Sequence, residues 1–139
     1  MILVDAGPLI SVVNFSELAL SVRLRGIFER DGEQFYTSPA VLTEAFHLTA
    51  RTGGWPQQSL VWKLLERHSI RVLQLRDADL DRTHQLMSRY ADRPMDFGDA
   101  TLVALAEVHR INRVFTLDSD FYIYRIHDRE AFDVINPSA

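Results

Sequence analysis

Short apolar runs alternate along this chain with longer segments that have the periodicity of helices. The runs are rich in β-branched and aromatic residues, as expected for strands buried inside a sheet. In the longer segments apolar residues recur every three or four positions. This alternation predicts βαβ units, and hence a three-layer α/β sandwich with a central parallel sheet between helices. The predicted strands are residues 2–4, 34–37, 71–75, 113–117 and 132–134, the last at an edge of the sheet.

Six segments carry the signals of helices, which begin at capping residues or prolines. Asp77 is the expected cap of one helix, which should turn Leu80, His84 and Met87 inward. The aromatic-rich residues 121–126 fit either one helical turn or an extended segment. The predicted helices begin at Pro8, after Ser16, at Pro39 behind a Ser38 cap, at Pro56, after Asp77 and after Asp96, and the second, third and fourth end near Gly32, Gly53 and His68.

The helix predicted after Asp96 is apolar on nearly every side. Residues 100–106 read Ala-Thr-Leu-Val-Ala-Leu-Ala, with no glycine or proline, so this helix should lie buried in the middle of the domain. Asp96 and Asp99 stand at its N-terminus, where the helix dipole favours negative charge. Two interpretations remain open here: a capping residue with a capping-box partner, or acids of a functional site.

Length and composition narrow the class of protein. The 139 residues suit a single domain, residues 1–139, and the absence of cysteine excludes disulfides and thiolate metal sites. The chain has no apolar run of the ~18 residues that span a membrane and no basic region of a signal peptide, so we expect a cytoplasmic protein. The net charge of −4 argues against a generic nucleic-acid binder. The basic residues are nearly all arginine, which suits phosphate contacts but also a GC-rich genome.

Four acids come from separate segments whose ends should meet. Asp5 and Asp118 each follow a predicted strand, Glu44 lies on the apolar face of a helix, and Asp99 opens the buried helix. In an open parallel sheet the functional crevice lies beyond the carboxyl ends of the strands, so these acids should converge there. Two such charges ~4 Å apart repel by about 4 kcal/mol near a protein surface unless a cation lies between them. Oxygen donors alone favour Mg²⁺ or Mn²⁺, and phosphodiester hydrolysis is the expected chemistry.

Each of these acids also fits a purely structural role. Asp5 fits a helix cap, Asp99 a first-turn acid and Asp118 a turn former, while Glu44 fits an ion pair with a buried arginine. The five histidines show no ligand spacing to one another. Three further residues are accessory candidates for the site: Asp96, Asp120 and Thr116. Asp96 and Asp120 fit caps or turns better than metal ligands. Thr116 could orient a carboxylate or a phosphate, but it fits a half-buried strand position better.

The order of these motifs resembles a PIN domain, and especially the VapC-type toxins of bacterial toxin–antitoxin pairs. The resemblance rests on Ile2-Leu3-Val4-Asp5, Ser38-Pro39, Glu44, Asp99 to Ala106, and Phe115 to Phe121, and it spans essentially the whole chain. It implies a parallel sheet between helices and Mg²⁺- or Mn²⁺-dependent endoribonuclease activity. It also implies that the acidic positions of the active site are Asp5, Glu44, Asp99 and Asp118.

Partners and alternatives follow from the same pattern. The resemblance implies an RNA substrate and a small antitoxin protein, and the large apolar residues around Trp55 and Trp62 suggest a homodimer face. A phosphoacceptor receiver domain is discounted because Lys63 falls inside a predicted helix. A haloacid-dehalogenase-type phosphatase is discounted because Gly7 stands where a second aspartate is needed. The remaining rival is a non-catalytic PIN domain that binds RNA or protein.

Overall fold

The computed structural model describes residues 1–137, and its centre is a parallel sheet. Five strands within this range form the sheet in the order β3-β2-β1-β4-β7, and every neighbouring pair is parallel. The predicted edge strand near the C-terminus is β7, so that prediction is confirmed. The strands are β1 (Ile2–Val4), β2 (Phe35–Thr37), β3 (Ile70–Val72), β4 (Arg113–Phe115) and β7 (Asp133–Ile135).

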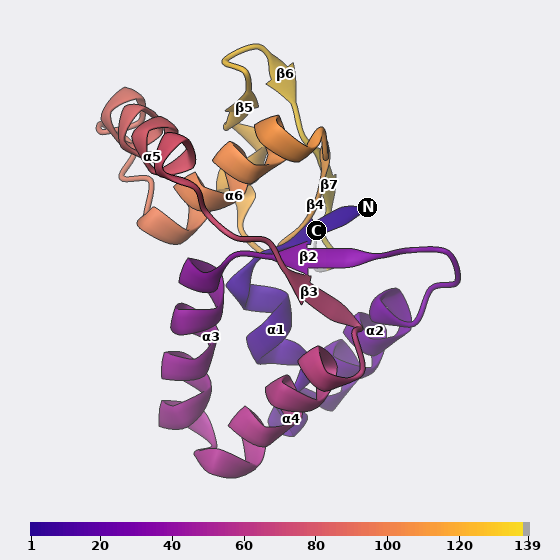
Figure 1. The fold of residues 1–139 in the computed structure, drawn as a ribbon. Helices are drawn as coiled ribbons and strands as arrows, with labels where there is room; N and C mark the ends of the chain where they lie inside the picture. The colour runs from indigo at the N-terminus through magenta and orange to yellow at the C-terminus, as the bar shows by residue number, and fades with distance from the viewer. Residues whose placement is uncertain (138–139) are drawn as a thin grey trace.

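Helices cover both faces of this sheet, as Figure 1 shows, so the predicted three-layer α/β fold is confirmed. Helices α1 to α4 lie on one side, and α5 and α6 lie on the other together with the small antiparallel hairpin β5–β6. The bounds are α1 (Ala6–Val12), α2 (Leu18–Phe28), α3 (Pro39–Thr52), α4 (Trp55–Glu66), α5 (Asp77–Arg89), α6 (Phe97–His109), β5 (Arg125–Ile126) and β6 (Glu130–Ala131), with 3₁₀ turns η1 (Phe15–Glu17) and η2 (Ser119–Tyr122).

Strand β1 lies between β2 and β4 and marks the point where the direction of the connections reverses. Helices α1 and α2 connect β1 to β2 on one face of the sheet, whereas α5 and α6 connect β3 to β4 on the other. Ligand crevices in open α/β sheets form at such a switch point, beyond the carboxyl ends of the strands. The fold therefore places the candidate crevice after Val4 and Phe115, which are register partners.

Helix α6 is the buried element that the sequence predicts. Every residue from Asp99 to Glu107 is buried on it, and Leu102, Val103 and Leu105 are fully inaccessible. Asp96 caps the helix, because its Oδ1 accepts a hydrogen bond of 2.7 Å from the N–H of Asp99. The structural role of Asp96 is thus confirmed, and the packing of α6 fixes where its N-terminus lies.

The prediction for the inward face of α5 was wrong for two of its three residues. Met87 is partly buried and packs against the core, as predicted. Leu80 and His84 are exposed, whereas Asp79, Thr83 and Leu86 are buried. The helix begins at Asp77, so the cap position is Arg76 and not the predicted Asp77. The carboxylate of Asp79 accepts hydrogen bonds from the backbone N–H and from the guanidinium of Arg76. This pairing lets an acid face the core, so the inward stripe is one residue earlier than apolar periodicity indicated.

Several other helices and strands begin or end a few residues away from their predicted limits. Helix α1 starts at Ala6 and not at Pro8, because Asp5 caps it. Helix α2 ends at Phe28, and β3 ends at Val72, before the predicted limits. Residues 121–126 combine both predicted alternatives, a 3₁₀ turn followed by the short strand β5. Within residues 1–137, no helix has the length and apolar character that crossing a membrane requires.

Candidate metal centre

Two of the predicted acids lie side by side at the switch point. Asp5 follows β1 directly, and its backbone N–H donates to the carbonyl of Phe115 at the end of β4. Asp118 lies three residues beyond β4, where its carboxylate accepts from the N–H of Asp120. The parallel pairing of β1 with β4 therefore brings together acids that are 113 positions apart in the sequence.

Thr116 connects these two acids. Its hydroxyl donates to Oδ2 of Asp5 over 2.8 Å and accepts from the backbone N–H of Asp118 over 2.9 Å. The side chain is fully buried. Of the two interpretations given by the sequence, the structure supports the one in which the hydroxyl orients a carboxylate, since this hydroxyl fixes the rotamer of Asp5.

The third acid enters from α6. Asp99 is 5% exposed, and its Oδ2 accepts a hydrogen bond of 3.1 Å from the hydroxyl of Tyr124. Tyr124 is fully buried and lies just before β5. The sequence pattern did not single out this residue, because an aromatic-rich segment usually signals packing. A possible signal was the phenol itself, which needs a polar partner when it is buried.

One oxygen from each of three acids can reach a common ion. The donor atoms of Asp5, Asp99 and Asp118 all lie within 4.8 Å of one another. Oxygens about 2.1 Å from a Mg²⁺ ion lie at most about 4.2 Å apart, so small side-chain rotations would bring these three to one centre. The donor set is all oxygen, which fits Mg²⁺ or Mn²⁺. The residues present therefore fit the metal that the sequence predicts.

Glu44 and Asp96 complete the lining of the same pocket. This pocket has a volume of about 300 Å³, and its other walls include the apolar side chains of Ile10, Leu48 and Leu117. Asp120 does not line the pocket, because its carboxylate lies 3.9 Å from the guanidinium of Arg93. The acids that the structure places around this pocket are Asp5, Glu44, Asp96, Asp99 and Asp118.

Burial and mutual repulsion strongly perturb these carboxyl groups. Burial raises the pKa of Asp99 to about 9, with further contributions from the charges of Asp5 and Asp96, while the bond from Tyr124 opposes the shift. Burial likewise raises the pKa of Asp5 to about 6, against the bonds from Thr116 and Ala6. Partial burial and the charges of Asp96 and Asp118 raise the pKa of Glu44. Without a cation, the raised pKa therefore keeps the Asp99 carboxyl protonated near neutral pH.

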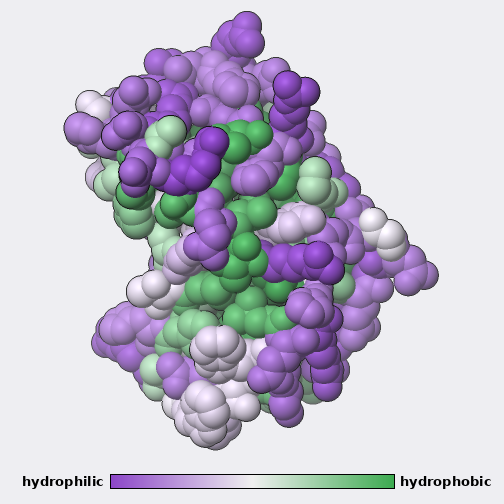
Figure 2. All heavy atoms as spheres, viewed as in Figure 1, coloured by the Kyte–Doolittle hydropathy of each residue, from purple (hydrophilic) through white to green (hydrophobic). Residues whose placement is uncertain are grey.

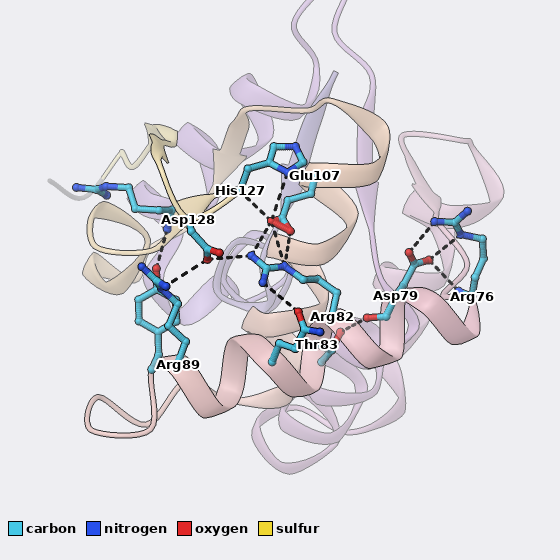
Figure 3. A network of polar contacts seen from close by, with 11 residues as sticks. Arg76, Asp79, Arg82, Thr83, Arg89, Glu107, His127 and Asp128 are labelled. Atoms are coloured by element: carbon cyan, nitrogen blue, oxygen red, sulfur yellow. Dashed lines mark hydrogen bonds and ion pairs between the residues drawn. The ribbon is translucent and has the colours of Figure 1, made fainter.

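The segment that carries Tyr124 is anchored by a second polar cluster, shown in Figure 3. Arg82 reaches from α5 to Glu107 of α6 at 2.6 Å and to Asp128 in the β5–β6 turn at 2.9 Å. The carboxylate of Glu107 also accepts from the backbone N–H of His127. Both turn residues, His127 and Asp128, have positive φ, the conformation of a type I′ turn. These contacts offset the backbone strain and hold the hairpin that follows Tyr124 against α6.

Comparisons with known proteins agree with this geometry. The sequence profile of the PIN domain matches residues 2–126. The chain therefore belongs to the PIN domain family, as the motifs indicated. A search of curated proteins found no match.

Two solved structures share the fold at low sequence identity. The toxin VapC20 of Mycobacterium tuberculosis, described as cleaving the sarcin–ricin loop, superposes with a TM-score of 0.76 at 20% identity, over 86% of this chain and 92% of that one. A chain of a toxin–antitoxin complex from Klebsiella pneumoniae superposes with a TM-score of 0.64 at 19% identity, over 99% and 98% of the two chains. The likeness establishes the common fold.

The raised pKa of Asp99 makes the stability of the metal-free protein depend on pH. The folded state holds a proton that the unfolded state releases above about pH 3.8. Stability is therefore lost as pH rises toward about 9, by at most about 1.4 kcal/mol per pH unit for this one proton. We expect urea unfolding in EDTA to give a lower free energy at pH 9 than at pH 6.5. Asp99→Asn should flatten this dependence, whereas the exposed control Asp31→Asn should not; equal slopes in all three proteins would contradict the assignment.

The hydrogen bond from Tyr124 should favour metal binding, because it stabilises the ionised form of Asp99. In Tyr124→Phe the pKa of Asp99 rises further, so a more tightly held proton must leave before a cation can bind. We expect a higher Mn²⁺ concentration to be needed to raise the melting temperature at pH 7, with the difference shrinking as pH increases. Tyr122→Phe, which removes a hydroxyl from an exposed ring, is the matched control. Identical Mn²⁺ titrations of Tyr124→Phe and wild type would count against this role.

Proposed function

We propose that this chain is a Mg²⁺- or Mn²⁺-dependent endoribonuclease that hydrolyses phosphodiester bonds in RNA. The proposal extends to a single domain, residues 1–139, that acts in the cytoplasm as the toxin of a toxin–antitoxin pair. The observation that carries it is the convergence of Asp5, Asp99 and Asp118 from three separate segments at the switch point of the sheet. Buried acids that gain nothing structurally from lying together suggest a site kept for a cation.

In this proposal Asp5, Asp99 and Asp118 would hold the ion, and Glu44 lines the same pocket. A bound Mg²⁺ or Mn²⁺ ion supplies an activated water and offsets the negative charge that develops on the phosphate. The protein's own contribution is positioning: Thr116 fixes the Asp5 carboxylate and Tyr124 fixes that of Asp99. The apolar walls formed by Ile10 and Leu117 limit the water around these charges, which strengthens their interactions.

The family and the neighbouring structures support the biological role. Membership of the PIN domain family favours ribonuclease activity, and the VapC20 structure is that of a toxin described as cleaving the sarcin–ricin loop. The second structure contains an antitoxin as well as a toxin, which favours a small protein partner for this chain. Four acids in the predicted positions favour catalysis over a PIN domain that only binds.

Neutralising one acid should change activity and stability in different ways. Asp99→Asn keeps the size of the side chain but removes a metal ligand, together with a carboxyl group that becomes charged only when its proton leaves. We expect Mn²⁺-dependent cleavage of single-stranded RNA to fall to near background, while the metal-free melting temperature stays equal or rises. Wild type should gain melting temperature when Mn²⁺ is added, and Asp99→Asn should gain much less.

A second substitution tests whether the acids act as one unit. Asp5→Asn should reduce cleavage as strongly as Asp99→Asn, and the double variant should lose little more than either, because residues of one unit are non-additive. The exposed control Asp31→Asn should keep full activity. Full activity in Asp99→Asn would rule out the catalytic assignment, and RNA binding without cleavage in wild type would favour the non-catalytic alternative.

The face formed by α2 and α4 is the proposed partner surface. Leu18 and Val22 are more than half exposed on α2, and Trp55 is 66% exposed at the start of α4. A groove of about 370 Å³ separates the two helices, with basic side chains that include Lys63 on its wall. Exposed apolar residues on helices that border a groove are typical of protein interfaces. We propose that this face binds a second copy of the chain or an antitoxin segment.

Sedimentation velocity tests the partner surface. We expect a dimer at micromolar concentration, and Leu18→Glu should shift it to monomer, because an unpaired charge cannot be buried at an apolar interface without a large cost. Val108→Glu is the matched control, since Val108 is also exposed but lies on α6. A monomeric wild type with no co-purifying small protein would remove both partners from the proposal.

A further inference from the structure

A second hollow adjoins the acidic pocket. It lies between the N-terminal half of α3 and the start of α6, has a volume of about 500 Å³, and shares Glu44 and Asp96 with the acidic pocket. Figure 2 shows the molecule notched on the side where Figure 1 places the starts of these two helices. Because both hollows have two residues in common, a ligand held in one extends into the other. The rest of the lining is uncharged or weakly basic: Ala40, Thr43, His47, Phe97 and Gly98.

Phe97 is the unusual residue of this hollow. It is the first residue of α6, the most buried helix of the domain, yet 46% of it is exposed. Its neighbour Met95 is 4% exposed, so apolar side chains at this end of the helix can reach the core. The ring instead stands beside the acids, where it offers an aromatic face to a ligand.

Gly98 lines this hollow and has no side chain that would fill it. A Cβ atom there would lie 3.4 Å from Oδ1 of Asp96 and 3.6 Å from Oε2 of Glu44. A side chain at this position would therefore occupy space beside the two carboxylates. Glycine leaves this space open beside a flat aromatic surface.

We propose that this hollow binds a nucleobase of single-stranded RNA, stacked on Phe97, next to the acidic pocket. The inference rests on the proposed ribonuclease function and names a substrate contact for it. The carboxylates of Glu44 and Asp96 repel a phosphate but accept hydrogen bonds from base N–H groups, such as the amino group of cytosine. A base can enter only when it is unstacked, so the hollow favours single strands over duplex RNA.

The test compares a strand that has bases with one that lacks them. The probes are a 12-nucleotide oligocytidylate and an abasic strand of the same length, each carrying a fluorescent label, with binding measured by anisotropy in EDTA at low salt. We expect wild type to prefer oligocytidylate, and Phe97→Ala to lose about tenfold in affinity for it, or about 1.4 kcal/mol, with no change for the abasic strand. Phe97→Trp should keep the preference, because the larger ring stacks at least as well. Phe15→Ala, which removes an equally exposed ring that lines neither hollow, should behave as wild type.

Two outcomes would overturn the inference. If wild type binds both strands equally, no base is recognised. If Phe97→Ala loses affinity for both strands alike, the ring shapes the surface or contacts a protein partner and does not stack a base.

Failure of the proposed function can be told apart from failure of this inference. The proposed function fails if wild type shows no Mn²⁺-dependent cleavage, whereas the binding comparison needs no cleavage. If wild type cleaves oligocytidylate, Phe97→Ala should reduce kcat/KM by a similar factor.

Discussion

The repulsion among buried carboxylates at the ends of β1 and β4 is the constraint on which the rest of this structure depends. Asp5 and Asp99 are less than a tenth exposed, and burial raises the pKa of both, with further contributions from the charges of neighbouring acids. A fold that needed only caps at these positions would gain nothing from burying them together. Protons or a cation between the carboxylates remove most of this repulsion. The arrangement therefore lowers the stability of the metal-free protein at high pH, but it keeps the acids in position to bind a metal ion.

Hydrogen-bond donors on separate elements keep the acids from turning away from one another. Thr116 holds Asp5 from the neighbouring strand, and Tyr124 holds Asp99 from the segment before the β5–β6 hairpin. The hairpin is itself fixed, because Arg82 and Glu107 bind its turn. A contact between α5 and α6 therefore contributes to the geometry of a pocket at the far end of α6. The site is assembled by the packing of the whole domain and not by one motif.

The fold and the candidate acids could be predicted because they depend on local signals. Strand ends, an apolar helix and acids placed after them are visible in the order of residues, so Asp5 and Asp118 could be expected at one edge. The inward face of α5 could not, since it depends on the pairing of Asp79 with Arg76. The role of Tyr124 could not be predicted either, because its partner Asp99 lies 25 residues away and only the packing of the β5 segment against α6 brings them together. The position of Asp120 beside Arg93 likewise depends on tertiary structure and not on a local sequence signal.

Helix α6 explains why core and site cannot be separated in this domain. Its body is fully buried, so the helix cannot slide or rotate without opening cavities, and Asp99 is therefore held at a fixed depth. The first turn of the same helix carries Phe97 outward and Asp99 inward, two residues apart, which places an aromatic face and a carboxylate on adjoining hollows. A helix less completely packed would let both groups move. The same apolar run that predicts burial in the sequence therefore also fixes the position of the first turn of α6. Substitutions deep in α6 should affect the site because they shift that turn.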